Sequence, residues 1–276
     1  MKLQIFLKCI CLNVFILSNI YAQQTLTIGT IDTQPNEKLI TFEPFAKYLE
    51  EKLKYQNIKV HVEVPKDINT AVILIKHKKL DIYIDSVYPT LLIQNQTNID
   101  IESKRWKNGN IGYKSVIFVN KNSGIRTLSD LEGKRIAFED EFSTSAYFVP
   151  KKAIENAGLS VSNEGAKSVR YSFARSEENA AVWLLYGKVD ASVTDDITYE
   201  GFDKKLFRVI YKSNLIPRHL VSFSNTVDKK LKKTVLAILY DMHKNTKGQE
   251  ILKRFSKTKK FSPLTNNDID LIKGYK

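Results

Sequence analysis

The sequence predicts an α/β protein of two lobes, and three observations support this prediction. Apolar stretches typical of strands alternate with stretches whose apolar residues recur at helical spacing. The alternation runs through two blocks, and a shorter portion follows them at the C-terminal end. No internal repeat, low-complexity tract or long linker interrupts the chain. We therefore expect largely parallel sheets in two lobes, with the last portion returning to the first lobe.

The first block is expected to run strand, helix, strand, helix, strand. Strands are expected at residues 25–31, 59–64 and 80–84, and helices at residues 43–53 and 70–77. The first two strands alternate apolar and polar side chains, as half-buried strands do. The first helix is indicated by four apolar residues at near-helical spacing, which are Phe42, Phe45, Leu49 and Leu53. The third strand ends at Asp85 and Ser86.

The second block begins near Ser115 and repeats the alternation. Its strands are expected at residues 115–119, 134–138, 168–173, 189–193 and 207–211, and its helical segments at residues 128–133, 143–158 and 178–186. The third portion starts near Pro217 with a strand at residues 219–223. A long helix then begins near Val227, and a short one at residues 267–273 closes the chain. The apolar stripe of the long helix consists of Leu231, Val235, Ile238 and Met242.

The chain is expected to cross between the lobes twice, at the extended segments near residues 115–120 and 213–218. We expect the first lobe to hold residues 23–115, the second lobe residues 116–216, and the returning part residues 217–276. Such an arrangement leaves a cleft between the lobes, and open α/β sheets bind ligands beyond the carboxyl ends of their strands.

Residues 1–22 have the features of an export signal. Lys2 and Lys8 give a basic start, residues 10–20 are mostly apolar, and Ala22 offers a small residue before the cleavage point. The apolar run is shorter than the roughly 20 residues of a membrane span. We therefore expect an exported, periplasmic protein without a retained anchor.

Cysteine occurs only at Cys9 and Cys11, inside this segment, and neither is preceded by the small residues of a lipoprotein site. A mature chain would then contain no disulfide, no catalytic thiol and no Cys-based metal site. Loss of Lys2 and Lys8 lowers the net charge from +13 to +11. Because the lysines are scattered and no nucleic-acid-binding motif accompanies them, we expect a solvated basic surface that can face an anionic membrane, and no nucleic-acid partner.

Ser143, Thr144 and Ser145 lie at the predicted start of a helix that follows the strand at residues 134–138. The first backbone N–H groups of a helix lack intrahelical partners, and the helix dipole adds partial positive charge. Together with three hydroxyls these groups form a candidate anion site. The alternative is that one of the three residues merely caps the helix, a position that Ser and Thr favour.

Three other polar segments also fall at the ends of predicted strands: residues 30–33, Asp85 with Ser86, and residues 194–196. Their convergence with the Ser143–Ser145 triplet favours a ligand site at this edge. Asp85 is either a ligand contact or a strand-end turn residue. Asp195 is either a ligand contact or the cap of the helix that follows it. Arg175, Arg218 and His219 are candidates to balance an anion, although Arg and His in loops are more often on the surface.

Enzymatic functions find little support in the sequence. The four histidines are isolated and form no HExxH or comparable metal spacing. The chain contains no GxSxG segment, no Cys–His arrangement and no GxxxxGK[ST] loop. We therefore expect a binding protein that is not an enzyme and that carries no cofactor or metal.

Several stretches together resemble the periplasmic solute-binding proteins of phosphonate and phosphite ABC transporters. They are IGTIDTQPNEKLITFEPFAKYLEEKL, KKLDIYIDS, GYKSVIFVNKNSGIRTLSDLEGKRIAF, FSTSAYFVPKKAIENAGL, ENAAVWLLYGKVDASVTDD and YKSNLIPRHLVSF. The likeness covers nearly the whole mature chain, and STSAYFVP is its most specific piece, with Ala146 where glycine is usual. The resemblance implies a type II periplasmic-binding-protein fold with two hinge crossings.

The resemblance also implies ligand contacts from Tyr113, Ser143, Thr144 and Ser145. Departures from the family pattern occur at Ile68, Ser176 and His219, where an aromatic, a histidine and a carboxylate are usual, so binding of an aminoalkyl phosphonate is in question. Asp85 also stands where a neutral or glycine-containing turn is usual. A carboxylate about 4 Å from an oxyanion costs several kcal/mol at an effective dielectric constant of 20. Asp85 is therefore turned away, paired, or matched by a positive group on the ligand, and Asp195 raises the same question.

These observations lead to one leading function and one alternative. The leading function is capture of a small phosphonate-like oxyanion between two lobes, by a monomer that delivers it to an ABC transporter permease. The alternative is a sensory module that reports a ligand, which need not be a phosphonate, to a membrane kinase or cyclase. The expected ligand-binding residues are Tyr113, Ser143, Thr144, Ser145, Asp85, Ser86, Asp195 and His219.

Overall fold

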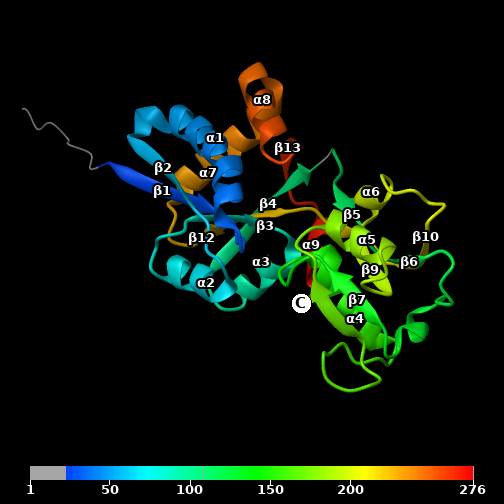
Figure 1. The fold of residues 1–276 in the computed structure, drawn as a ribbon. Coiled ribbons are helices and arrows are strands. Elements are labelled where there is room, and N and C mark those ends of the chain that lie inside the picture. The colour runs from blue at the N-terminus through cyan, green and yellow to red at the C-terminus, as the bar shows by residue number, and fades with distance from the viewer. Residues whose placement is uncertain (1–22, 108, 276) are drawn as a thin grey trace, which may run out of the picture.

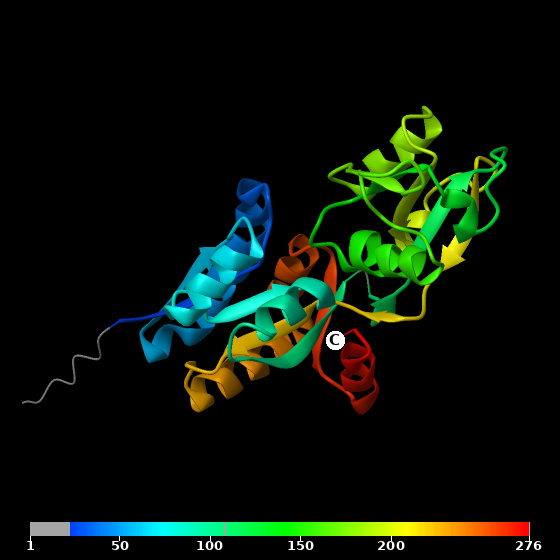
Figure 2. The ribbon, with the colours of Figure 1, turned by 90° about the horizontal axis from the view of Figure 1, so that it is seen from below.

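The computed structural model of the chain describes residues 23–107 and 109–275 and contains two larger sheets side by side (Figures 1 and 2). We call the elements around the six-stranded sheet the first lobe and those around the five-stranded sheet the second lobe. The predicted export signal, with Lys2, Lys8, Cys9 and Cys11, lies outside the described residues. None of the helices in the described part of the chain is long and apolar enough to span a membrane.

The sheet of the first lobe has the strand order β13-β4-β12-β3-β1-β2. Its strands are β1 (Gln24–Gly29), β2 (Ile58–Glu63), β3 (Ile82–Asp85), β4 (Ile99–Lys107), β12 (Leu220–Ser224) and β13 (Thr258–Pro263). The strands β2, β1 and β3 run parallel, whereas β12 pairs antiparallel with both β3 and β4. The strand that returns from the C-terminal part therefore lies in the middle of this sheet, and the sheet is mixed.

The helices of the first lobe bury the stripes that the sequence predicts, except that Ile238 is half-buried and its neighbour Leu239 is buried instead. They are α1 (Pro35–Leu53), α2 (Ile68–Lys76), α3 (Val87–Gln94), α7 (Lys229–Asp241) and α8 (Thr246–Arg254), with 3-10 turns at Lys54–Gln56 and Met242–Lys244. Helix α1 starts earlier than expected, because Pro35 occupies its first turn. Phe45 of α1 stacks on Phe255 at 4.5 Å between ring centroids, which ties α1 to the segment after α8.

The sheet of the second lobe has the order β10-β6-β9-β7-β8. Its strands are β6 (Ser115–Asn120), β7 (Arg135–Phe138), β8 (Arg170–Phe173), β9 (Ala191–Asp195) and β10 (Phe207–Lys212). Strands β8, β7 and β9 pair in parallel, whereas β6 pairs antiparallel with both β9 and β10. Both sheets are therefore mixed, and the expectation of largely parallel sheets is met only in part. The helical elements are a 3-10 turn at Leu128–Leu131, a π-helical turn at Thr144–Phe148, α4 (Val149–Asn156), α5 (Glu177–Leu185) and α6 (Asp196–Tyr199).

The chain crosses between the sheets at two short strands that pair with each other. These are β5 (Gly112–Tyr113) and β11 (Ile216–Pro217), which are antiparallel with Tyr113 opposite Ile216. The expected crossing at residues 213–218 is correct, but the one expected at residues 115–120 is wrong. That segment is β6, whose first five residues are buried inside the second sheet. The lobe boundaries in the sequence analysis stay a prediction.

An apolar cluster joins the two lobes beside this pair of crossings. It contains Val87, Leu91, Tyr113, Val149, Ile216, Leu220 and Ile272. Its members come from α3 and β12 of the first lobe, α4 of the second, both crossing strands, and the C-terminal helix α9 (Asn266–Lys273). The lobes are therefore packed against each other at the crossings, and the space that remains between them lies beyond the carboxyl ends of the parallel strands.

Candidate functional site

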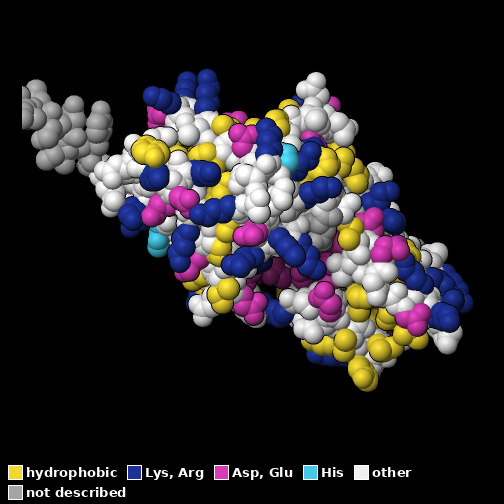
Figure 3. Space-filling model, turned by 90° about the horizontal axis from the view of Figure 1, so that it is seen from above, with side chains coloured by type: hydrophobic (Ala, Val, Ile, Leu, Met, Phe, Trp, Pro, Cys, Tyr) yellow, Lys and Arg dark blue, Asp and Glu magenta, His cyan; other side chains and the backbone are white. Residues whose placement is uncertain are grey.

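A polar cavity of about 380 Å³ lies between the two lobes. Figure 3 shows the hollow from above, with Asp and Glu side chains inside it and Lys and Arg side chains around it. All eight residues expected from the sequence line this cavity: Tyr113, Ser143, Thr144, Ser145, Asp85, Ser86, Asp195 and His219. A second hollow of about 520 Å³, between α1 and β2, contains none of them. The structure thus brings the predicted residues together, and their contact with a ligand stays a prediction.

Ser143 is both the cap of a helical run and part of the cavity wall. Its hydroxyl oxygen accepts a hydrogen bond from the backbone N–H of Ala146 at 3.1 Å, so the capping interpretation is correct. The same residue lines the cavity, together with Thr144 and Ser145, which are 1% and 6% exposed. A hydroxyl that accepts one bond still has its own hydrogen to donate. Capping therefore leaves this hydrogen for one acceptor in the cavity, either the Glu139 carboxyl or a bound anion.

Thr144 and Ser145 connect the triplet to other elements. The Thr144 hydroxyl accepts a bond from the backbone N–H of Tyr88 in α3, at 2.9 Å, which links the lobes. Next to it, Tyr88 stacks on Phe148 with 4.3 Å between ring centroids. The Ser145 carbonyl accepts a bond from the Ser115 hydroxyl in β6, at 2.5 Å. These bonds fix the backbone of the triplet while it borders the cavity.

Tyr113 lies in the first crossing strand and is 4% exposed. Burial raises the pKa of its hydroxyl, while Arg218 and a hydrogen bond with Ser145 act in the opposite direction. The phenol therefore stays protonated and available as a donor at neutral pH. One face of its ring is covered by the Arg218 guanidinium, whose central carbon lies 4.2 Å from the ring centroid.

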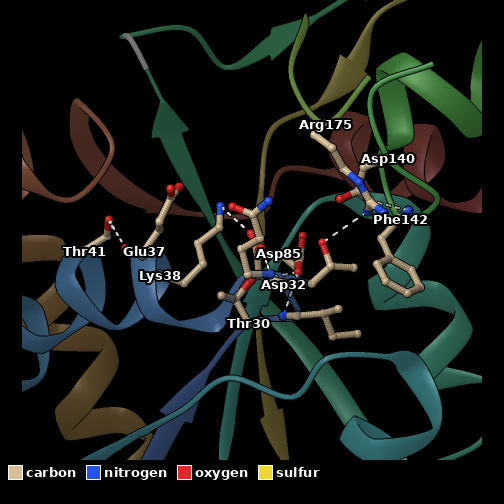
Figure 4. A network of polar contacts seen from close by, with 12 residues as sticks. Thr30, Asp32, Glu37, Lys38, Thr41, Asp85, Asp140, Phe142 and Arg175 are labelled. Carbon is tan, nitrogen blue, oxygen red and sulfur yellow. Dashed lines mark hydrogen bonds and ion pairs between the residues drawn. The ribbon is translucent and has the colours of Figure 1, made fainter. Parts of the chain in front are cut away.

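Asp85 is held by groups of its own lobe (Figure 4). One carboxylate oxygen accepts bonds from the Thr30 hydroxyl at 2.8 Å and the Tyr83 hydroxyl at 2.9 Å. The other accepts the backbone N–H of Ser86 at 2.6 Å. Asp85 thus fastens the ends of β1 and β3 to each other, which is the paired arrangement considered in the sequence analysis.

Asp195 is likewise engaged on both of its oxygens. Oδ1 accepts bonds from the backbone N–H groups of Ile197 and Thr198 at 2.9 and 2.7 Å and so caps α6. Oδ2 lies 3.6 Å from Nη1 of Arg218. Asp195 is 8% exposed, so it is a buried cap that faces a buried cation at the cavity wall.

Arg218 is the lining cation whose position the sequence predicts least well. It follows β11 and is 1% exposed, although arginine in a loop is usually on the surface. Its neighbour His219 is also enclosed. Burial first, and then the charges of Arg105, Lys107 and Arg218, hold the pKa of His219 well below its usual range. The imidazole is therefore neutral at physiological pH.

Arg175 contacts the opposite lobe at the mouth of the cavity. Its Nη1 lies 3.5 Å from the Thr33 hydroxyl, and its backbone φ is 72°, a value uncommon outside glycine. Figure 4 shows Arg175 on the second lobe and Asp32 with Lys38 on the first. Asp32 and Lys38 form an ion pair at 3.3 Å. These groups make polar contacts around the space between the lobes.

The cavity contains carboxylates that the sequence analysis did not single out. Its acidic residues are Asp32, Glu37, Asp85, Glu139, Asp140, Glu177, Glu178 and Asp195, and its basic residues are Lys38, Lys107, Arg175 and Arg218. Eight acids against four bases make a site that repels an oxyanion, unless some of the acids are neutral or paired.

Burial reduces this repulsion, because it favours the neutral form of two of the acids. It raises the pKa of Glu177 to about 8, with the charges of Glu139 and Asp195 adding to the effect. Burial also raises the pKa of Glu139, whereas Ser143 acts in the opposite direction by hydrogen bonding. Glu177 is thus mainly protonated at neutral pH. Glu139 directly follows β7, so the strand-end argument used for Asp85 applies to it as well.

In the described residues no group of three or more His, Cys, Asp or Glu is placed to hold a metal ion. The site therefore consists of a helix start with hydroxyls, the enclosed side chains of Tyr113 and His219, and charged groups of both signs. Such an arrangement suits a small polar ligand that is bound through hydrogen bonds.

Comparison with known proteins places this site in a family. Residues 28–269 match the family model described as ABC transporter, phosphonate, periplasmic substrate-binding protein. The phosphonates-binding periplasmic protein of Escherichia coli K12 is 24% identical over 247 residues, which cover 84% of this chain and 70% of that protein. The family resemblance inferred from the sequence is confirmed.

Two solved structures are similar in fold. A protein of Xanthomonas citri, solved with bound ATP, aligns with a TM-score of 0.83 at 18% identity, covering 91% of this chain and 95% of the other. PhnD1 of Prochlorococcus marinus, solved in complex with methylphosphonate, aligns with a TM-score of 0.72 at 20% identity, covering 92% and 97%. These likenesses confirm the two-lobed α/β fold of periplasmic binding proteins.

Proposed function

Because the chain belongs to the periplasmic substrate-binding proteins of phosphonate ABC transporters, we propose that it captures a small phosphonate-like oxyanion between its lobes. It then delivers this ligand to the permease of an ABC importer. The observation that carries the proposal is the position of Ser143, Thr144 and Ser145, which start a helix at the wall of the cavity. Backbone N–H groups and hydroxyls at such a point bind the oxygens of an anion.

The eight residues expected from the sequence have three different roles in this proposal. Tyr113 and the three residues of the triplet donate hydrogen bonds to the oxyanion. Asp85 and Asp195 hold strand and helix ends in place, because their oxygens are already engaged by the protein. Ser86 and His219 border the same space and complete its wall.

The protein acts as a monomer in the periplasm and has no nucleic-acid partner. It binds its ligand and does not transform it, as expected for a family of substrate-binding proteins. The family description names a transporter, so the sensory alternative is not retained. Closure of the lobes over the ligand would exclude water, strengthen the hydrogen bonds and present one shape to the permease.

The test is a thermal-shift screen and calorimetric titration of the mature protein. Methylphosphonate, phosphite, inorganic phosphate and sulfate are compared with neutral and cationic metabolites. A ligand at a thousandfold excess over Kd stabilises the folded state by about 4 kcal/mol, which gives a clear shift in Tm. The proposal requires a shift with at least one oxyanion. A shift confined to cationic or neutral compounds would contradict it.

A further inference from the structure

Arg218 is buried at the cavity wall with one edge of its guanidinium free of partners. The side chain is 1% exposed, yet Nε and Nη2 have no hydrogen-bond partner among the described residues. Nη1 alone faces a carboxylate, Asp195, at 3.6 Å. Burying N–H donors of a charged group without acceptors costs several kcal/mol, and proteins rarely leave them so. An acceptor is therefore expected at this edge.

The free edge has the geometry that oxyanions require. Nε and Nη2 form one edge of the planar guanidinium and present two roughly parallel N–H groups in its plane. Such a fork binds two oxygens of one phosphonate or carboxylate at once. Since Arg218 lines the cavity, the fork is within reach of a ligand held there.

The surroundings of Arg218 favour a negative charge at the same place. The buried Arg105 and the cavity-lining Lys107 lie close enough to Arg218 for the three positive charges to repel one another. Burial first, and then repulsion from Arg105 and Arg218, lower the pKa of Lys107. Burial likewise lowers the pKa of Arg105 to about 10, and Arg218 adds to this effect. Arg105, Lys107 and Arg218 are thus close to one another, and the carboxylates that act on them include Asp85, Glu139 and Asp195.

Tyr113 connects this wall to the Ser143–Ser145 triplet. The Arg218 guanidinium lies over the face of the Tyr113 ring at 4.2 Å, and the Tyr113 hydroxyl hydrogen-bonds with Ser145. Arg218 therefore contacts the face of one buried aromatic ring, and the triplet contacts its hydroxyl. An oxyanion beside that ring is reached by the fork from one direction and by the start of the helix from the other.

We propose that Arg218 is the charged residue that selects the oxyanion, by binding two of its oxygens through Nε and Nη2. This inference rests on the proposed function and adds the source of the positive charge, which the triplet does not supply. Arg218 retains its contact with Asp195 through Nη1, so that Asp195 holds the fork in position for the ligand.

The experiment is titration calorimetry with methylphosphonate and inorganic phosphate on the wild type, Arg218→Met, Arg218→Lys and Arg126→Met. Two charge-assisted hydrogen bonds are lost in Arg218→Met, so its affinity is expected to fall by about 100-fold or more. Arg218→Lys keeps the charge without the fork and should lose about tenfold. Arg126 is an exposed arginine of the second lobe outside the cavity lining, so Arg126→Met should stay within about threefold.

The Tm of each variant without ligand, taken together with its affinity, separates ligand binding from a structural role. Arg218→Met removes two unmet donors but also the cation beside the buried Asp195, so its Tm without ligand is expected to fall; if Arg218 binds the ligand, the folded variant loses affinity as well. A lower Tm together with wild-type affinity would make Arg218 a structural partner of Asp195 and overturn the inference alone. If the wild type binds none of the oxyanions tested, both the inference and the proposed function fail.

Discussion

Glu177 shows how one buried carboxyl changes what the cavity can bind. It stands in the first turn of α5, and its Oε1 accepts the backbone N–H of Asp195 at 2.8 Å. Its carboxyl faces Glu139, Asp195 and Thr198, and it lies among acids because three strand or helix ends meet there. In the protonated form Glu177 donates a hydrogen bond to an anion, and in the ionised form it repels one.

Oxyanion affinity is therefore expected to fall as the pH rises through about 8, the value to which burial raises the pKa of Glu177. The folded protein also holds this proton where the unfolded chain has released it. For this group, stability thus falls between a pH of about 4.5 and a pH of about 8 and is level above. Calorimetry with methylphosphonate from pH 6.5 to pH 9 measures the effect. Comparison with Glu177→Gln cancels the titration of the ligand itself. Equal pH profiles for the two proteins would refute this role.

The two roles of Ser143 are separable by a matched pair of substitutions. Ser143 accepts a bond from the N–H of Ala146 at 3.1 Å, and Ser176 accepts one from Asn179 at 3.0 Å. Each serine caps a helical segment, but only Ser143 lines the cavity. Both alanine variants should lose about 1 kcal/mol of stability in urea unfolding. Only Ser143→Ala should also bind methylphosphonate more weakly, by about tenfold, and equal affinities would mean that Ser143 is a cap alone.

All eight residues expected from the sequence line one cavity. Six of them follow predicted strands, whose ends converge in α/β sheets, whereas Tyr113 came from the family resemblance and His219 was a candidate to balance an anion. The sequence did not single out Glu139 and Glu177, since single carboxylates after a strand or in a first helical turn are common. It also left Arg218 as one of three open candidates. The Arg218 side chain is buried against Tyr113 and Asp195, which are distant in sequence. The sequence around Arg218 therefore does not predict its burial.

At the scale of elements, β4 and α9 depend on one buried ion pair. Lys104 of β4 and Asp268 of α9 are 4% and 5% exposed, and the Nζ–Oδ2 distance is 2.5 Å. Asp268 also accepts bonds from the backbone and hydroxyl of Thr265, and so completes a capping box. Burial acts to raise the pKa of Asp268, but Lys104 and Thr265 outweigh it and lower the pKa.

Breaking this pair from one side is expected to destabilise the protein strongly. Lys104→Met leaves the Asp268 carboxylate buried without its cation, at a cost of about 3–5 kcal/mol in urea unfolding. The control is Lys273→Met on the same helix, whose pair with Asp270 is exposed, and which should change stability by less than about 1 kcal/mol. Similar losses in the two variants would show that the buried pair contributes no more than a surface pair.

The Lys104–Asp268 pair is one reason why β4 was not predicted from the sequence. Its sequence, IDIESKRWK, is dominated by charged residues and gives no clear apolar alternation. In the structure Lys104 meets Asp268, and Arg105 lies over the Phe255 ring at 4.8 Å. Buried charged residues whose partners are distant in sequence do not give the apolar pattern by which a strand is predicted. The apolar residues of β1, β2 and β6 do give that pattern.

At the scale of the whole molecule, the two-lobed α/β fold follows from the alternation of elements along the chain. The first crossing was misplaced because β5 has only two residues, too few to produce a pattern. Its partner β11 is as short, and the two are held by pairing and by the apolar cluster around Ile216 and Leu220. Hinge positions of this kind are set by tertiary contacts, which the sequence does not display.

The position of β12 has a consequence for how the protein is assembled. All strands of the second sheet lie between residues 115 and 212, whereas the first sheet requires β12, at residues 220–224, between β3 and β4. A chain that emerges N-terminus first can therefore complete its second lobe while β3 and β4 still await their shared neighbour. In pulsed hydrogen exchange during refolding of the full chain, amides of β6, β7 and β9 should gain protection before those of β3 and β4. Simultaneous protection would argue against this order. The first lobe, whose N-terminal part is synthesised first, is thus the last to complete its sheet. Until β12 is added, the edges of β3 and β4 are unpaired and can pair with strands of other chains.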